Sequence, residues 1–157
     1  VHRTPLVFSC LLLKNVYWTI FLHRFEVSNS SAHHMLQQIG LVAVGGAIGA
    51  GLRYLIGTWI SYETFPVATI TVNLVGSFLL GIVALSTSQN LISSDLALFI
   101  GTGLIGAFTT MSAFSVDTME LLQEGNSSTA GIYILLTFSL CPILAWCGWL
   151  VGNKYLI

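Results

Sequence analysis

Residues 101–115 read GTGLIGAFTTMSAFS, inside an apolar run that extends from 96 to about 122. Glycine weakens a helix, and serine and threonine hydroxyls offer the backbone alternative hydrogen-bond partners. A run rich in both therefore predicts a helix that is interrupted partway. Gly101, Gly103 and Gly106 also match the GxGxxG pattern of dinucleotide-binding proteins, but we expect no β-α-β unit around them, so we reject that interpretation.

The composition of the whole chain is that of a membrane protein. Of its 157 residues 55% are hydrophobic and only 7% are charged, whereas soluble domains carry about 25% charged residues. Spanning a bilayer of roughly 30 Å takes about 20 helical residues, and four segments are long enough, at about 38–60, 66–85, 96–122 and 130–151. The sequence therefore predicts an all-α integral membrane protein of four transmembrane helices with a broken third helix.

Several classes of function are excluded by what the chain lacks. Its formal net charge of -1 provides no basic surface for nucleic acid. The cysteines and histidines show no metal-ligand spacing, and no histidine follows His34, so no catalytic constellation is expected in the apolar core. We predict that the protein is not an enzyme and binds no nucleic acid.

The first 34 residues are treated as an N-terminal extension, and the transmembrane domain as 35–157. The apolar stretch 5–22 carries Lys14 and Asn15 in its middle, so it is a poor fifth span, a signal or anchor, or sequence upstream of the true start. We favour the last interpretation, because Met35 directly precedes the first convincing helix.

Arginine and lysine are scarce in the predicted transmembrane domain, which contains only Arg53 and Lys154. Because lysine and arginine in short loops set the orientation of membrane proteins, this domain has almost no orientation signal. Two outcomes stay open, insertion both ways up with a dimer of opposed copies, or one weak orientation set by Lys154.

Polar residues inside the first two spans have two interpretations each. Thr69, Asn73 and Ser77 form a stripe at i, i+4 and i+8, which either glues helices together by hydrogen bonds or supplies neutral donors along a permeation path. Arg53 follows a glycine stripe that indicates a packing face. Its guanidinium either anchors the structure or attracts anions at a vestibule.

Three blocks of this sequence, 45–54, 65–81 and 101–114, resemble the CrcB/Fluc fluoride channels in order and spacing. The resemblance implies a passive fluoride-selective channel that exports fluoride from the cytoplasm and lowers its toxicity. It further implies an antiparallel, dual-topology dimer in a bacterial plasma membrane, multi-pass, with a structural Na+ held by backbone carbonyls of Gly106 and Thr109. The fluoride path would include these residues: Thr69, Asn73, Ser112, Phe114, Met111, Thr137 and Cys141.

Met111 departs from the family pattern, which has a phenylalanine there. Aromatic ring edges face anions favourably, and a thioether lacks that quadrupole. Two identical copies would therefore make a poorer pore, which raises the hypothesis of a heterodimer with a second family subunit in place of a homodimer.

Two other functions compete with a channel. A small proton-coupled exporter needs a membrane-buried carboxylate, for which Asp117 and Glu120 are the only candidates in the spans. The glycine stripes alone would also suit a non-transporting assembly subunit.

Overall fold

The computed structural model describes residues 32–60 and 65–157. The chain falls into two units, Val1–Leu36 and Gln37–Ile157, and the account below concerns the second. Apart from its last three residues, the expected extension 1–34 lies outside the described residues, and its boundary stays a prediction.

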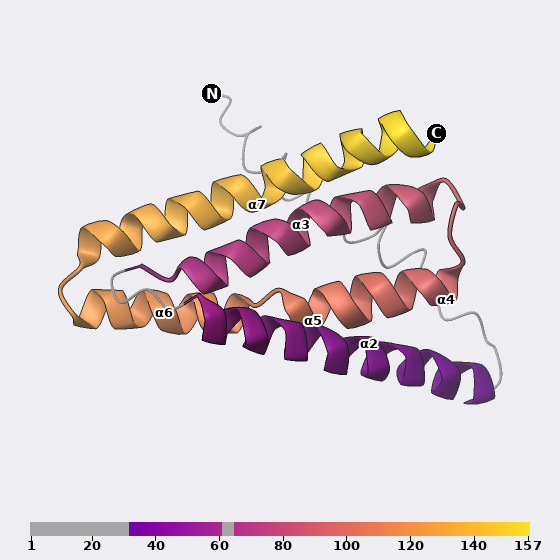
Figure 1. The fold of residues 1–157 in the computed structure, drawn as a ribbon, viewed down its shortest axis with the longest axis horizontal. Helices are drawn as coiled ribbons and strands as arrows, with labels where there is room; N and C mark the ends of the chain where they lie inside the picture. The colour runs from indigo at the N-terminus through magenta and orange to yellow at the C-terminus, as the bar shows by residue number, and fades with distance from the viewer. Residues whose placement is uncertain (1–31, 61–64) are drawn as a thin grey trace, which may run out of the picture. The chain divides into compact units, whose positions relative to one another are not determined.

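Four helical segments of the described chain are long and apolar enough to cross a membrane, as the sequence predicted. Three are continuous helices, and the third span is built of four pieces (Figure 1). The continuous helices are α2 (Ala32–Trp59), α3 (Val67–Ser88) and α7 (Ser127–Leu156), and the third span consists of α4 (Ser94–Ala97), a π-helical stretch η1 (Leu98–Ile105), α5 (Gly106–Phe108) and α6 (Met111–Gln123).

The third span is broken between α5 and α6, which confirms the prediction. Thr109 has φ -76° and ψ 153°, and Thr110 has φ -148° and ψ 113°, so two residues of extended backbone separate the two helices. Thr110 then caps α6, because its side chain accepts a hydrogen bond from the Ala113 N–H at 3.1 Å. The π-helical stretch before the break was not predicted.

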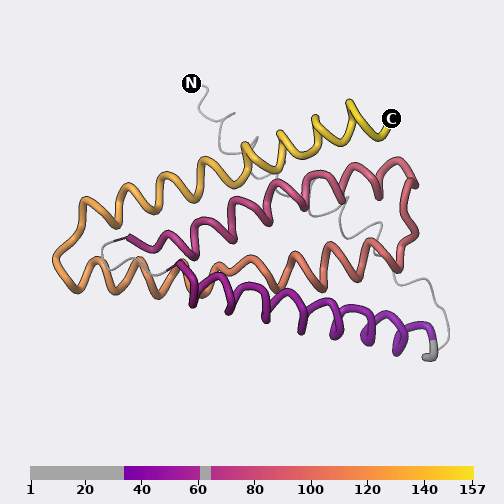
Figure 2. The backbone as a smooth tube through the Cα atoms, viewed as in Figure 1, coloured from indigo at the N-terminus to yellow at the C-terminus, as the bar shows by residue number. Residues whose placement is uncertain are grey.

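Helices α3 and α7 lie side by side along most of their length (Figures 1 and 2). Glycines make this approach possible: an added Cβ at Gly81 would collide with the Ala145 carbonyl, and one at Gly148 with the Phe78 carbonyl. Backbone therefore meets backbone in this pair, as small residues allow between membrane helices.

Helix α2 packs onto η1 through glycines in the same way. A Cβ at Gly45 would collide with the Phe99 carbonyl, and a Cβ at Gly49 with the Leu104 carbonyl. From the other side, a Cβ at Gly103 would lie 2.9 Å from the Val42 carbonyl oxygen. The glycine stripe of the first span is a packing face, as the sequence indicated.

Large apolar side chains cover the outside of these helices, as Trp59 (81% exposed) and Leu135 (68%) illustrate. The buried cluster is small by comparison, and it consists of Ile70, Phe114, Leu121, Ala130 and Tyr133. An apolar exterior around a modest interior suits a multi-pass membrane protein, in which lipid is the outer solvent.

Candidate functional site

Asn73 on α3 holds the break of the third span. Its Nδ2 donates to the Thr110 carbonyl at 3.0 Å, and its Oδ1 accepts from the Thr110 N–H at 2.7 Å. Both groups are buried, and they lie 37 residues apart in sequence. The Asn73 amide thus replaces the helical acceptor that the Thr110 N–H has lost, and it adds a donor to the Thr110 carbonyl, which as the N-cap also begins α6.

The break releases two carbonyls from helical pairing. In a continuous α-helix the N–H of Thr110 would donate to the Gly106 carbonyl and that of Ala113 to the Thr109 carbonyl. Here the first N–H donates to Asn73 and the second to the Thr110 hydroxyl. The oxygens of Gly106 and Thr109, which the family resemblance implied as cation ligands, are therefore without their i+4 donors, and the Gly106 oxygen accepts instead from the Thr109 hydroxyl at 3.5 Å. Carbonyls released in this way are suitable ligands for a small cation.

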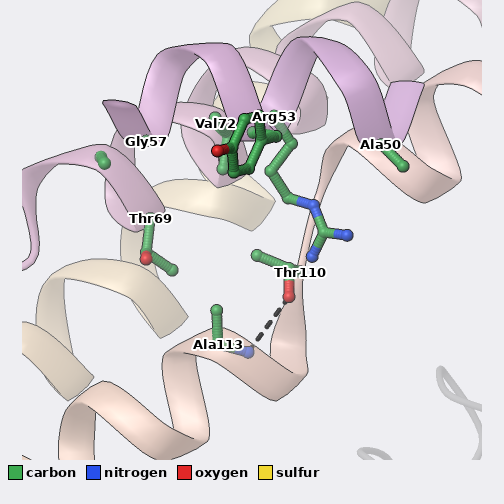
Figure 3. A pocket seen from close by; sticks show the side chains of 9 residues that line it. Ala50, Arg53, Gly57, Thr69, Val72, Thr110 and Ala113 are labelled. Atoms are coloured by element: carbon green, nitrogen blue, oxygen red, sulfur yellow. Dashed lines mark hydrogen bonds between the residues drawn. The ribbon is translucent and has the colours of Figure 1, made fainter. Parts of the chain in front are cut away.

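A cavity of about 240 Å³ opens between α2, α3 and the start of α6. Arg53 of α2, Thr69 of α3 and Thr110 line it, and the Arg53 guanidinium points toward Thr110 (Figure 3). The first turn of α6 begins at the same place, and the N-terminus of a helix carries partial positive charge. The cavity is therefore electropositive, as the interpretation of Arg53 as an anion-attracting residue requires.

Asp117, one of the two carboxylates that an exporter would need, is paired with a phenol of α7. Its Oδ2 accepts a hydrogen bond from the Tyr133 hydroxyl at 3.0 Å, and Tyr133 is fully buried. Phe65 and Phe114 pack against the Tyr133 ring at centroid distances of 5.6 Å and 5.0 Å. An acid–phenol pair surrounded by aromatic rings therefore links α6 to α7.

Thr137 lies one turn beyond Tyr133 on α7 and is buried. Among the described residues, its hydroxyl is the only buried side-chain polar group without a hydrogen-bond partner. A hydroxyl in a helix usually bonds to a backbone carbonyl one turn earlier, so a buried one left free is unusual. The family resemblance had implied Thr137 as a path residue.

The remaining path residues have more varied surroundings. Phe114 is buried against Phe138, edge to face, at 5.6 Å. Ser112 is exposed, and its hydroxyl lies 3.1 Å from that of Thr110. Met111 is 57% exposed, and Cys141 is half-buried. The structure thus brings Arg53, Thr69 and Asn73 together at Thr110, whereas Thr137 and Cys141 lie along α7.

Two residues at the site were missed from the sequence. Thr110 was missed because the sequence does not show where in the run 101–115 the backbone becomes extended, although a threonine before a helix is a common cap. Tyr133 was missed because it looks like an ordinary apolar residue. Its spacing of four from Thr137 would have placed it on the same helical face.

Comparison with known proteins adds an independent finding. The family model described as "CrcB-like protein, Camphor Resistance (CrcB)" matches residues 40–149. A protein named "Fluoride-specific ion channel FluC" from Shewanella sp. (strain ANA-3) is 42% identical over 111 residues, covering 69% of this chain and 90% of that protein. A protein of the same name from Oceanobacillus iheyensis is 40% identical over 115 residues, covering 72% and 89%. The chain therefore belongs to the CrcB family.

Proposed function

We propose that this protein is a passive fluoride-selective channel that lets fluoride leave the cytoplasm. Family membership supports the proposal, because the relatives matched above carry the name of a fluoride-specific ion channel. The structural observation that carries it is the interrupted third span held by Asn73, since irregular backbone within a span is found where protein or water satisfies it.

Neutral donors suit this substrate. Fluoride is small and strongly hydrated, so a pore has to replace its water without binding it too tightly to release. One of the two Nδ2–H groups of Asn73 donates to the Thr110 carbonyl, which leaves the second as a donor for the ion. The Thr137 hydroxyl is buried without a partner. We propose that these donors, with Thr69, Ser112 and Cys141, accompany the ion, with Phe114 and Met111 forming the less polar wall.

Arg53 has a different part in this proposal, because it lies at an electropositive cavity beside Thr69. A fixed guanidinium on the path itself would hold a halide too firmly. At a vestibule it raises the local concentration of anions, which increases the rate of entry. We place Arg53 at the entrance and not in the narrow path.

We also propose that two copies form an antiparallel dimer around a structural Na+. The residues fit such an ion, because the Gly106 and Thr109 carbonyls have lost their helical donors and Na+ prefers oxygen ligands. When bound, the ion would neutralise carbonyl dipoles that meet at the centre of the assembly. The domain's shortage of lysine and arginine supports opposed orientations.

A fluoride-electrode assay tests the function. Liposomes containing the purified chain are loaded with potassium fluoride, and valinomycin starts efflux. We expect rapid fluoride release that needs no pH gradient, and no comparable release from chloride-loaded liposomes. Parallel liposomes contain a second family subunit as well, which tests the heterodimer hypothesis raised by Met111. Absence of fluoride release in both preparations would contradict the proposal.

The proton-coupled exporter is the weaker alternative. The carboxylates of the described spans all lie in the third. Asp95 is at its very start and accepts from the Gln37 amide, Asp117 accepts from the Tyr133 hydroxyl, and Glu120 is exposed. The relatives are named as ion channels, and not as exporters or enzymes. This agrees with the prediction that the protein is not an enzyme. Fluoride release that follows an imposed pH gradient would favour the exporter.

In bacteria we place the protein in the plasma membrane.

A further inference from the structure

Helices α3 and α7 run parallel (Figure 1), and each carries a polar stripe with a spacing of four residues. The members are Thr69, Asn73 and Ser77 on α3, and Tyr133, Thr137 and Cys141 on α7. Gly148 lies two turns after Cys141 on the same face of α7, and an added Cβ there would collide with the Phe78 carbonyl of α3. The Cys141 side chain is therefore on the side of α7 that faces α3.

Two unsatisfied polar groups lie next to this thiol. The Thr137 hydroxyl, one turn earlier, is buried and unpartnered within the described chain, whereas buried hydroxyls are normally satisfied by protein or by ordered water. Pro142 follows Cys141 directly, and it lacks the N–H that would donate to the Phe138 carbonyl one turn earlier in the helix. Both groups favour water beside Cys141.

Cys147 on the same helix provides a comparison. Both thiols are half-buried, so accessible area does not distinguish them. The residues three and four positions from Cys147 are all apolar, namely Ile143, Leu144, Leu150 and Val151. Cysteine reacts as the thiolate, which forms in water and is disfavoured in apolar surroundings. The two cysteines of α7 are therefore similarly exposed but face different solvents.

We propose that Cys141 is a modification site for small, uncharged sulfur electrophiles, and that the attached group stops fluoride flux. With a thiosulfonate the thiol loses its proton to water, its sulfur bonds to the reagent's thiol-level sulfur, and the S–S bond of the reagent breaks to release a sulfinate. The product is a mixed disulfide beside Thr137. The block rests on the proposed function, because both residues belong to the proposed fluoride path, whereas the reactivity of the thiol does not.

Reactivity is measured first, because it needs no flux. The full chain in liposomes is treated with methyl methanethiosulfonate for increasing times, and peptide mass spectrometry follows the labelling of each cysteine. We expect Cys141 to be labelled at least about tenfold faster than Cys147, because only Cys141 has polar groups that favour water beside it. Equal rates for the two thiols, or faster labelling of Cys147, would overturn the inference.

Fluoride efflux is then measured before and after labelling for the wild type, Cys141→Ser and Cys147→Ser. Each labelled rate is expressed relative to the untreated rate of the same variant. We expect labelling to lower efflux at least about tenfold in the wild type and in Cys147→Ser, and dithiothreitol to restore it by reducing the mixed disulfide. Cys141→Ser keeps Cys10 and Cys147, so the reagent should leave its efflux unchanged.

Two flux results would overturn the block. One is wild-type efflux that persists after complete labelling of Cys141, and the other is an equal loss of efflux in Cys141→Ser. If no preparation releases fluoride before labelling, the proposed function fails, and the labelling rates alone decide whether Cys141 is a modification site.

Discussion

At the residue scale, Asn73 makes two hydrogen bonds of opposite polarity to one residue. Asn73→Asp keeps an acceptor for the Thr110 N–H but removes the donor to the Thr110 carbonyl and adds negative charge. Losing a buried hydrogen bond and repelling the ion should lower fluoride flux at least about tenfold in the electrode assay. Unchanged flux would remove Asn73 from the path.

Substitution of Thr137 should change the stability of the protein and its fluoride flux in opposite directions. An unsatisfied buried hydroxyl costs about 1–3 kcal/mol, so the isosteric Thr137→Val should raise the melting temperature in detergent. The same change removes a donor that a passing anion would use, and we expect flux to fall about tenfold. A variant with lower stability or full flux would contradict this assignment.

Thr118→Val is the matched control for Thr137→Val. The Thr118 hydroxyl donates to the Phe114 carbonyl at 2.7 Å, so it is already satisfied within its own helix. Thr118→Val therefore removes a hydrogen bond that exists, whereas Thr137→Val removes a hydroxyl that has no partner. We expect no gain in melting temperature from this variant, which separates the free hydroxyl of Thr137 from a general preference for valine.

The polar residues show how far sequence reasoning reaches at this scale. The stripe of Thr69, Asn73 and Ser77 was visible from spacing alone, and two interpretations were left open, packing and transport. The structure shows that Asn73 bonds to backbone of another span, which the sequence could not show, because the partner is 37 residues away. Such pairings depend on how helices come together, and spacing along one helix does not encode them.

At the scale of elements, close helix contact depends on particular glycines and not on glycine content. Gly49→Ala would place a Cβ against the Leu104 carbonyl and force α2 away from η1. Overpacking of this kind costs about 1–3 kcal/mol, so we expect a clearly lower melting temperature in detergent.

Gly51→Ala, two residues later on the same helix, is the control. An added Cβ there meets nothing within 4 Å, so alanine should be neutral or stabilising by about 0.5–1 kcal/mol. Equal effects of the two substitutions would show that α2 does not pack through Gly49.

The interrupted third span was predictable in kind but not in detail. Clustered glycines and hydroxyls between 101 and 115 indicated a break, because several residues there weaken a helix together. Asn73 of another span bonds to the backbone at the break, and glycines of α2 pack directly against the π-helical stretch Leu98–Ile105. These are tertiary contacts, which the local sequence does not show.

At the scale of the whole molecule, the proposed dimer and Na+ are tested at Gly106. This residue is exposed, and an added Cβ would lie 3.5 Å from the Gly101 carbonyl oxygen, an ordinary contact. A larger side chain should therefore leave the break intact within one copy. If the Gly106 carbonyl faces a second copy across a shared ion, the added bulk acts on assembly instead.

We expect Gly106→Val to weaken dimerisation in detergent about tenfold or more, measured by light scattering over a dilution series. Gly131→Val is the control, because a Cβ at Gly131 meets nothing within 4 Å and lies on α7, away from the break. Replacing Na+ with N-methylglucamine should weaken the wild-type dimer and have less effect on the Gly106→Val variant, whose dimer no longer depends on the ion. Because an added Cβ at Gly106 has room within one copy, a dimer unaffected by both the substitution and the loss of Na+ would place the interface elsewhere on the molecule.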